Sequence, residues 1–531
     1  MRMQDGFENF LTAYERKAAP LLQDASEAYW KATTKGRPED EERAARLTAD
    51  FRKLHADPEA YTRLKSWRET GEVTDPILAR QLTMLIDAYA AQQIPLEKIE
   101  EIARREQEIE SRFTNYRPVL DGRPVSDNDL RGVLVKENDS ARRRAAWEAS
   151  KLIGVEVAPL LRTLVEERNK AARDLGFENY YRMRLLLDEL DEAHLFAILD
   201  DLKIRTDRPF AMAKAELDTE LAGRFGIAVA DLRPWHYADP FFQESPPADA
   251  IDLDGFFLDR DPVALTRSFY AGMGLPADDV IGRSDLYERE KKNQHAYCTD
   301  IDRRGDVRIL ANVRPNEYWM NTMLHECGHA VYSKYHDPSL PFLLRDSAHI
   351  FTTEAIAMMM GRLTKNADWL HRQVGVEAQV AAEAARALGK QLQLAELIFI
   401  RWGLVMVYFE REMYRDPGQD LNSLWWRLAK ELQMVTPPEG RNAPDYASKI
   451  HLGTAPVYYH NYILGTLAAS QINKAVLKAG SGRDGLAGDV AAGNFLREKI
   501  FSVGARYHWN EMLKRATGEE LTAKYFVEEF V

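Results

Sequence analysis

The chain has 531 residues, of which 45% are hydrophobic and 29% are charged. A chain of this length can bury a large core, and this balance is typical of globular proteins rather than disordered ones. The net charge of -12 at pH 7 argues against nucleic acid as a general partner, because phosphate binding needs a positive field.

The N-terminal segment and the cysteines predict where the protein works. The segment MRMQDGFENFLTAYERKAAP is charged and amphipathic, so we expect no signal peptide. Because no uninterrupted apolar stretch reaches about 18 residues, we expect neither a transmembrane helix nor a membrane partner. Only two cysteines occur, Cys298 and Cys327, which favours a reducing, cytoplasmic setting.

Most of the chain shows the spacing of helices. Residues 3–115 carry apolar side chains three to four positions apart, as at Leu47, Phe51 and later positions. A short break at 118–124 is followed by further long helical patterns. Residues 233–262 contain several prolines and aromatic residues, which predicts a long irregular connection of the kind that often borders functional sites.

One segment favours strands. Residues 295–301 and 306–313 are rich in β-favouring residues and flank a glycine-containing turn at 302–305, which predicts a hairpin. The free edge of such a hairpin can pair with an extended peptide. A purely structural ribbon is the alternative interpretation.

The most specific motif is His325-Glu-Cys-Gly-His329, in a helix predicted to begin near Asn316. Residues i and i+4 share one face of a helix, so both imidazoles can bind one metal ion. Glu326 lies beside that face, where it can take a proton from a water molecule. This spacing is typical of zinc peptidases.

Zinc held by two histidines of one helix needs a third protein ligand and one open position. The best candidate is Glu354, which follows the second histidine by 25 residues, a spacing that suits a helix, a turn and a return. Thr352 or Thr353 is predicted to cap a second helix and so to place this glutamate in its first turn. His336 and His349 are the rival ligands.

A loop with glycine and proline runs into a tyrosine cluster at residues 449–462. The negative charge of a tetrahedral intermediate needs a hydrogen-bond donor beyond the metal. Tyr459 and Tyr462 are three positions apart and would share a face of a helix. Buried tyrosines whose hydroxyls bond within the protein are the alternative interpretation.

These motifs resemble the angiotensin-converting-enzyme family of zinc peptidyl-dipeptidases and, more loosely, the thimet-type oligopeptidases. In both groups, which are gluzincins, a glutamate is the third zinc ligand. The resemblance spans roughly residues 140 to 531. It includes Trp147-Glu-Ala-Ser, His295-Ala296, the segment from Leu324 to Glu354, Lys449-x-His451, Tyr459-x-x-Tyr462 and Trp509-Asn-Glu-Met-Leu.

The resemblance implies a role for each matched residue. One Zn2+ ion would be bound by His325, His329 and Glu354, with Glu326 as the general base; Tyr462 and His451 would serve the oxyanion side; His295 and Ala296 would bind the peptide backbone; Lys449 and Tyr459 would grip the C-terminal carboxylate of the substrate.

Three positions depart from the family pattern. The chloride-binding arginine of the family falls at Asn461. An aspartate that orients the first zinc-binding histidine falls at Met358, so His325 needs another partner. The family's glutamine that helps bind the terminal carboxylate has no clear counterpart near Trp235, which weakens the expectation of strict dipeptide release.

We therefore predict a mainly α-helical, two-lobed metallopeptidase with a deep central cleft and a small antiparallel β-ribbon near the metal. Residues 1–115 would form an N-terminal helical lid region and residues 116–531 the helical catalytic region. The predicted activity is peptidyl-dipeptidase-like hydrolysis of short peptides by zinc-activated water. The sequence predicts no particular oligomeric state.

Three alternative functions are weighed against this one. The first is an oligoendopeptidase that cuts inside peptides, and the second is a helical metallocarboxypeptidase, which also uses His-Glu-x-x-His. The third is a catalytically silent binding scaffold. The joint presence of Glu326, Glu354 and Tyr462 argues against the scaffold.

Overall fold

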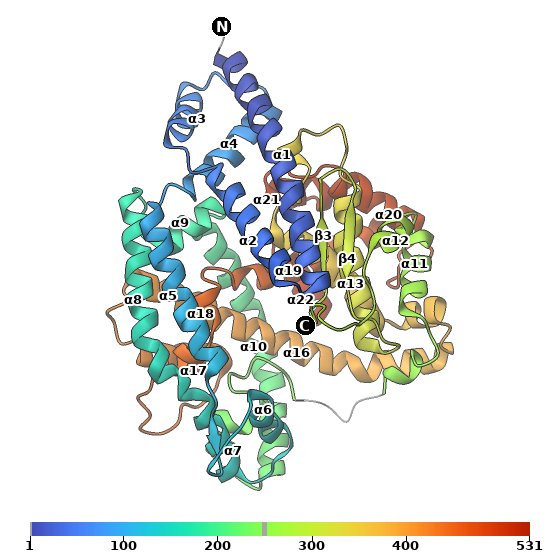
Figure 1. The fold of residues 1–531 in the computed structure, drawn as a ribbon. Coiled ribbons are helices and arrows are strands. Elements are labelled where there is room, and N and C mark those ends of the chain that lie inside the picture. Colours follow the sequence, from blue (N-terminus) through green and yellow to red (C-terminus); the bar gives the residue numbers. More distant parts are fainter. Residues whose placement is uncertain (1–2, 247–251) are drawn as a thin grey trace. The chain divides into compact units, whose positions relative to one another are not determined.

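The computed structural model describes residues 3–246 and 252–531. In these residues helices predominate, and the strands form two antiparallel sheets of two strands each. The predicted mainly α-helical fold with a small β-ribbon is therefore confirmed (Figure 1). The chain divides into two compact units, each assembled from stretches that are distant in the sequence.

Unit 1 consists of Met1–Gln93, Ile251–Leu388 and Leu464–Tyr525. Its elements are α1 (Met3–Lys35), α2 (Pro38–Lys53), α3 (Pro58–Thr70), α4 (Pro76–Ala90), α11 (Pro262–Gly272), α12 (Asp278–Arg283), β3 (Tyr297–Asp300), β4 (Val307–Leu310), α13 (Glu317–Lys334), α14 (Ile350–Gly361), α15 (Ala367–Trp369), α20 (Val490–Leu496) and α21 (Trp509–Thr517).

Unit 2 consists of Ile94–Ala250, Gly389–Ile463 and Phe526–Val531. Its elements are α5 (Leu96–Asn115), β1 (Val119–Leu120), β2 (Arg123–Pro124), α6 (Asp127–Lys136), α7 (Ser140–Lys151), α8 (Ile153–Asp174), α9 (Tyr180–Leu187), α10 (Glu192–Phe225), α17 (Leu421–Gln433) and α18 (His451–Thr454). Three helices continue across a boundary in the sequence between the units: α16 (Ala378–Arg415), α19 (His460–Ala479) and α22 (Lys524–Phe530).

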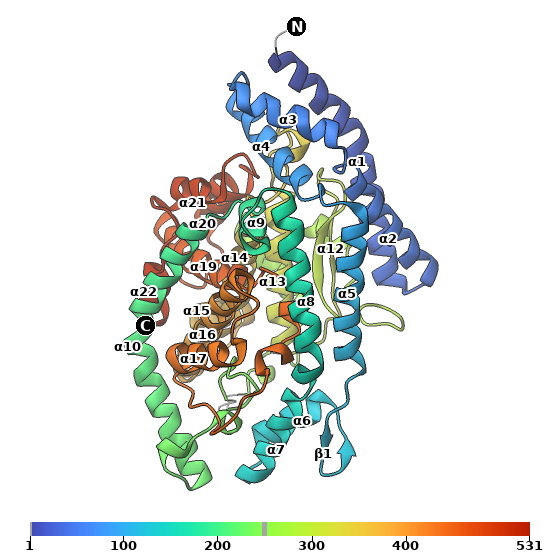
Figure 2. The same cartoon turned by 90° about the vertical axis from the view of Figure 1, so that its left-hand side faces the viewer.

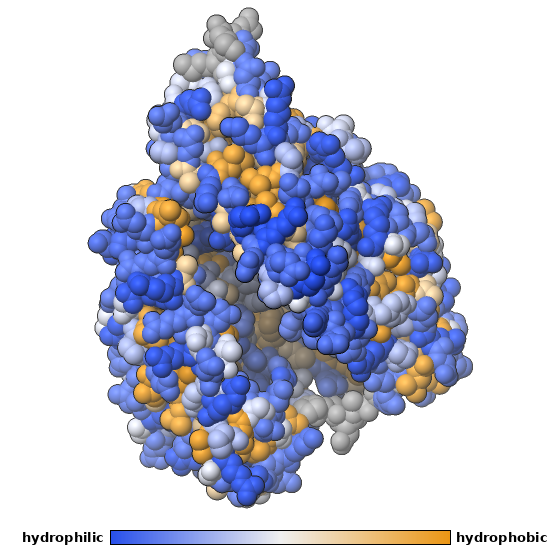
Figure 3. Space-filling view, viewed as in Figure 1, coloured by the Kyte–Doolittle hydropathy of each residue, from blue (hydrophilic) through white to orange (hydrophobic). Residues whose placement is uncertain are grey.

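The N-terminal helices fold on a core of their own within unit 1. Asp57 and Asp75 cap α3 and α4, and a proline follows each aspartate at the first helical position, where its missing N–H is not needed. The buried cluster includes Phe7, Leu64 and Leu85. Apolar residues also show on the surface around α1, α3 and α4 (Figure 3).

The predicted hairpin is present with shorter strands. β3 pairs antiparallel with β4, from Tyr297 opposite Leu310 to Asp300 opposite Val307. Both strands lie beside α13 (Figure 1). The other edge of β4 meets Asp285 in a single bridge, whereas no strand among the described residues pairs with the other edge of β3.

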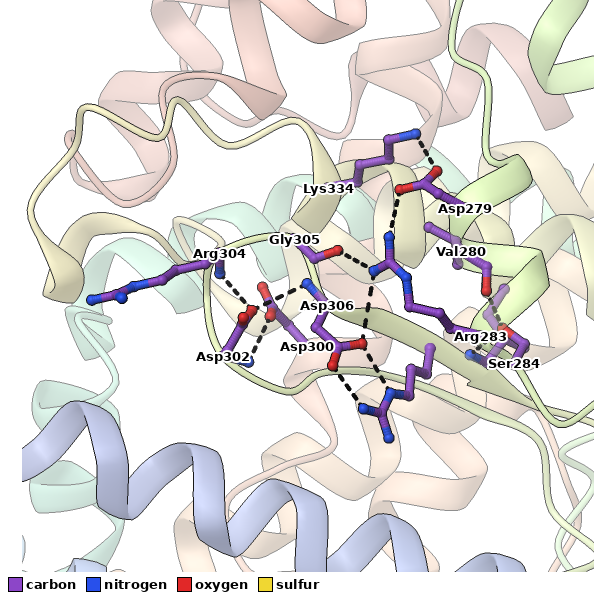
Figure 4. A network of polar contacts seen from close by, with 12 residues as sticks. Asp279, Val280, Arg283, Ser284, Asp300, Asp302, Arg304, Gly305, Asp306 and Lys334 are labelled. Atoms are coloured by element: carbon purple, nitrogen blue, oxygen red, sulfur yellow. Dashed lines mark hydrogen bonds and ion pairs between the residues drawn. The ribbon is translucent and has the colours of Figure 1, made fainter.

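A polar network fixes the hairpin turn to its neighbours (Figure 4). The carboxylate of Asp302 accepts the backbone N–H groups of Arg304 and Asp306. Arg283 of α12 donates to the Gly305 carbonyl at 2.6 Å and to Asp279, which also pairs with Lys334 at the end of α13. The turn is thereby tied to the helix that carries the metal motif.

The helix predicted to begin near Asn316 does so. Asn316 caps α13 by accepting the N–H of Trp319 at 2.9 Å. The predicted cap of the next helix was wrong: His349 is the N-cap of α14, its ring accepting the Phe351 N–H. Glu354 therefore lies in the second turn of α14 rather than in the first, because the helix begins earlier than the threonines suggested.

Unit 2 is organised by long helices. α5 and α8 lie side by side in Figure 2 and exchange many contacts. The helix α16 contains the one stretch in the described residues that is long and apolar enough to cross a membrane. Since 61% of that stretch is buried inside the protein, a core helix explains its composition.

The predicted irregular connection is present over the described part of 233–262. It contains short 3-10 turns at Pro234–His236 and Asp254–Phe256. Residues 247–251 of this prediction lie outside the described residues.

Candidate functional site

The three predicted metal ligands come together in unit 1. Nε2 of His325 lies 3.7 Å from Oε2 of Glu354, and Nε2 of His329 lies 3.8 Å from Oε1 of the same carboxylate. The three ligand atoms all lie within 4.8 Å of one another. In the part of the chain that the structure describes, no other group of histidine, cysteine and acidic side chains converges in this way.

This donor set fits zinc. Tetrahedral zinc with bonds of about 2.0–2.1 Å to nitrogen sets its ligand atoms roughly 3.3–3.5 Å apart, close to the observed separations. Burial lowers the pKa of His325 to about 4 and that of His329 to about 3, so both rings are neutral near pH 7. Two neutral imidazoles and one carboxylate are the protein ligands of many catalytic zinc ions.

The close approach of two helices builds this group. A Cβ atom on Gly328 would lie 2.9 Å from the Cα atom of Ala357, so only glycine allows α13 to approach α14 this closely. Gly465 also packs against α14, where an added Cβ would meet the Cβ of Glu354 at 3.6 Å. Backbone packing at two glycines thus positions the helix that carries Glu354.

Thr353 is a neighbour of the metal group that the sequence did not indicate. Its Oγ1 lies 2.7 Å from Nδ1 of His329, the ring nitrogen that faces away from Glu354. A hydroxyl at this place can hold the ring in one orientation.

Glu326 is buried beside the metal group, at 8% exposure. Burial, together with the charge of Glu354, raises its pKa to about 8, although the backbone N–H of Cys298 in β3 opposes the shift. A cation at the neighbouring ligands would offset the repulsion from Glu354. A carboxylate with a raised pKa in such a position is suited to accept and return a proton.

A cavity of about 600 Å³ contains these side chains. The three ligand residues and Glu326 line one side, and Ala296 to Asp300 of the hairpin line another. Leu22 of α1 also contributes, so an N-terminal helix borders the metal cavity within unit 1. The unpaired edge of β3 therefore faces the space beside the ligands.

The other histidines of unit 1 take different places. His336 lines the cavity beyond the end of α13 but is not a member of the metal group. His349 serves as the cap of α14. His295 is exposed just before β3 and does not line this cavity, whereas its neighbour Ala296 does.

The tyrosine segment belongs to unit 2. The ring centroids of His451 and Tyr459 lie 5.4 Å apart, and those of Tyr459 and Tyr462 lie 5.3 Å apart. Tyr459 is buried and its hydroxyl accepts from Nε1 of Trp402 at 2.7 Å, while the Tyr462 side chain is 39% exposed. The two rings are in contact, but Tyr459 lies in the turn before α19 (His460–Ala479), so the two tyrosines do not share a face of one helix.

Lys449 has a partner that the sequence did not reveal. Its ammonium donates to Oε1 of Gln243 at 2.7 Å and lies 5.8 Å from the centre of the Tyr459 ring. Burial lowers the pKa of Lys449 to about 8, so the group stays mainly protonated at pH 7. A glutamine, a lysine and a tyrosine therefore meet in unit 2.

Asp239 explains how an irregular loop presents Gln243. Its buried carboxylate accepts the backbone N–H groups of Phe241, Gln243 and Glu244. Phe242, between them, has a φ of 51°, which the loop stabilises through these bonds. No regular spacing links Gln243 to Lys449 in the sequence, so only the folded loop identifies the pair.

Comparisons with known proteins agree with this arrangement. The family model of angiotensin-converting enzyme matches residues 2–204 and 277–530, which is most of the chain. An angiotensin-converting enzyme of Theromyzon tessulatum is 21% identical over an alignment covering 97% of this chain and 89% of that protein. Carboxypeptidase 1 of Bacillus subtilis (strain 168) is 24% identical over 44% of this chain and 51% of that protein.

The matched residues include both ligand-bearing helices and the tyrosine segment, and they leave out the whole irregular connection that carries Gln243. The family match covers all three residues of the metal group in the cavity. The chain belongs to the angiotensin-converting enzyme family of metallopeptidases.

Proposed function

We propose that this chain is a zinc-dependent peptidyl-dipeptidase-like enzyme that hydrolyses short peptides. The observation that carries the proposal is the convergence of His325, His329 and Glu354 in a cavity that Glu326 and the β3 edge also line. Zinc, when bound, would polarise the scissile carbonyl and acidify a water molecule.

The residues of unit 1 supply the chemistry of attack. Glu326 takes a proton from the attacking water and passes it to the leaving nitrogen as the peptide C–N bond breaks. A peptide in extended form pairs with the free edge of β3, where Ala296 offers backbone groups. His295 then binds a substrate carbonyl from the start of the strand.

The residues of unit 2 supply stabilisation and specificity. Tyr462, supported by His451, donates a hydrogen bond to the oxyanion. Lys449 and Tyr459 grip the C-terminal carboxylate of the substrate, and Gln243 joins them. An ammonium with neutral donors around it suits one carboxylate. This set supports release of a C-terminal dipeptide.

The N-terminal helices are proposed to act as a lid that favours short peptides. Three contacts within unit 1 tie α1 to the hairpin and the metal cavity. Thr33 pairs with Tyr297, Glu27 with Arg308 at 2.9 Å and Glu15 with Arg345 at 3.8 Å. A folded protein chain would have to displace them to enter.

A peptide digest tests this function. The zinc-loaded enzyme is incubated with a hexapeptide and with its C-terminally amidated form, and the products are identified by mass spectrometry. The proposal expects dipeptides from the free acid and at least tenfold slower cleavage of the amide, because the carboxylate grip is lost. Equal rates with internal cuts would replace it with an oligoendopeptidase.

A second candidate is a metallocarboxypeptidase. The similarity to a bacterial carboxypeptidase, which covers 44% of the chain, favours it. The two enzymes share the need for a free C-terminus but differ in the product. Release of single amino acids in the same digest would select the carboxypeptidase.

A further inference from the structure

Two buried charged side chains hold the segment 451–459 in unit 2. The Arg168 side chain is 0% exposed, and it donates to the carbonyl of Gly453 at 2.6 Å. Glu410 is 3% exposed, and its carboxylate accepts the backbone N–H of Val457 at 2.8 Å. The segment is therefore fixed at two points by residues of α8 and α16.

Val457 has an unusual backbone conformation at the second of these points. Its φ is 56°, in the left-handed region that β-branched residues rarely adopt, and its side chain is buried at 2% exposure. Such a conformation persists only where surrounding contacts impose it. The hydrogen bond to Glu410 is the polar contact that imposes it here.

The burial of Glu410 is not explained by charge pairing alone. Arg168 already donates to Glu106 at 2.6 Å and to the Tyr414 hydroxyl at 3.0 Å. A buried carboxylate is costly, and an apolar side chain of similar size would usually suit such a place better. Burial raises the pKa of Glu410 to about 7, and the Val457 N–H and the charge of Arg168 oppose this rise. The Glu410 carboxylate therefore stabilises the backbone of the segment 451–459.

The held segment joins the side chains of the proposed oxyanion and carboxylate sites. His451 begins it, Tyr459 ends it and Tyr462 follows it, with their three rings in successive edge-to-face contact. A shift of the backbone at Val457 would move the tyrosines relative to the histidine. Placement within about 0.5 Å matters for hydrogen bonds that act on a transition state.

We propose that Glu410 and Arg168 are positioning residues that fix His451, Tyr459 and Tyr462 relative to one another. This inference rests on the proposed peptidase function. The pair controls the rate of hydrolysis, whereas zinc binding depends on the helices of unit 1.

Two substitutions at one position test the inference. Glu410→Leu removes the acceptor for Val457, while Glu410→Gln keeps an oxygen that can accept the same N–H. In zinc-loaded enzyme, Glu410→Leu is expected to lower kcat at least tenfold with zinc content unchanged, and Glu410→Gln to recover most of the rate. Asp207→Leu is the control, because it removes the carboxylate partner of Arg401, a buried arginine on the same helix as Glu410.

Hydrogen exchange supplies a readout that does not depend on activity. In Glu410→Leu, the amide of Val457 is expected to exchange at least tenfold faster, while peptides from α13 and α14 exchange as in the parent. Unchanged exchange, an unchanged kcat, or equal losses in the Leu, Gln and Asp207 variants would each overturn the inference. A parent enzyme without peptidase activity would instead refute the proposed function, and the exchange result would still decide whether Glu410 fixes the segment.

Discussion

Nδ1 of His329 lies 2.7 Å from Oγ1 of Thr353, the residue directly before Glu354. For Nε2 of this ring to bind a metal, Nδ1 must carry the proton, so the Thr353 hydroxyl accepts a hydrogen bond from the ring. The contact couples two proposed ligands on different helices. At many zinc sites, a carboxylate or a carbonyl accepts this hydrogen bond from the zinc-binding histidine.

Thr353→Val keeps the side-chain volume and removes this acceptor. We expect zinc affinity to fall by about 10- to 100-fold, because the ring loses its fixed orientation. Competition with a chromogenic chelator measures the zinc affinity. Thr353→Ser is expected to retain parent affinity, and Thr62→Val, at an exposed position of α3, serves as the control. Equal affinity of the Val variant and the parent would contradict an orienting role.

Glu326→Gln separates proton transfer from metal binding. The amide is nearly the same size but cannot accept the proton of water, so we expect kcat to fall by about 10²- to 10⁴-fold. Zinc content, measured by atomic emission, should match the parent because Glu326 is not among the three ligands. Glu383→Gln, on an exposed part of α16, should leave both quantities unchanged. If Glu326→Gln kept the activity of the parent, the observed hydrolysis would not come from this site.

The metal group could be predicted because it depends on the spacing of residues that lie close together in the sequence. Two histidines four positions apart on one helix share a face in any fold, and a glutamate at the right distance needs only a turn between two helices. The hairpin was also predictable from adjacent β-favouring runs and a glycine turn. The start of α14 was not, because the His349 ring capped the helix in place of a threonine hydroxyl.

The contact between Gln243 and Lys449 could not be predicted from the sequence. Gln243 meets Lys449 only because Asp239 folds an irregular loop around three backbone N–H groups. Such a contact spans more than two hundred positions and leaves no periodic pattern. The contact of His329 with Thr353 was missed for another reason: a threonine near a helix start is usually a cap, and its tertiary partner is invisible in the sequence.

Gly328→Ala tests the close approach of the two ligand helices. The added methyl group would meet Ala357 at 2.9 Å, so α13 must move away from α14. We expect a loss of about 1–3 kcal/mol in the free energy of unfolding together with weaker zinc binding. Gly389→Ala is the matched control. Its Cβ meets nothing within 4 Å on an exposed part of α16, so the variant should be slightly more stable. If Gly328→Ala bound zinc like the parent, the ligand spacing would not depend on this contact.

Gln243→Leu tests the newly found partner of Lys449. The variant loses a polar contact to a substrate carboxylate, and a hydrogen bond to a charged group contributes about 1.5–3 kcal/mol. We expect KM for a free-acid peptide to rise by about 10- to 100-fold, with little change for its amide. Gln379→Leu on the surface should change neither value. Equal effects on acid and amide would show that Gln243 has a structural role only.

Lys151 gives unit 2 a predictable dependence on pH. Its ammonium lies 3.2 Å from the centre of the Phe241 ring, and the residue is 3% exposed. Burial lowers the pKa of Lys151 to about 7, whereas the unfolded chain keeps a value near 10.5. The folded state therefore binds this proton less tightly than the unfolded state. The stability linked to Lys151 is fully present above pH 10.5 and declines as the pH falls toward 7.

Lys151→Met removes this dependence while preserving an unbranched side chain. Relative to the parent, we expect the variant to gain roughly 1.4 kcal/mol for each pH unit between 10 and 7, and no more below pH 7. Urea unfolding at pH 9.5 and at pH 7 measures the difference. Lys390→Met, at an exposed position of α16, should differ from the parent in free energy of unfolding by the same amount at both pH values. A constant loss of stability in Lys151→Met at both pH values would mean that packing of the lysine stem, and not the burial of its charge, dominates at this site.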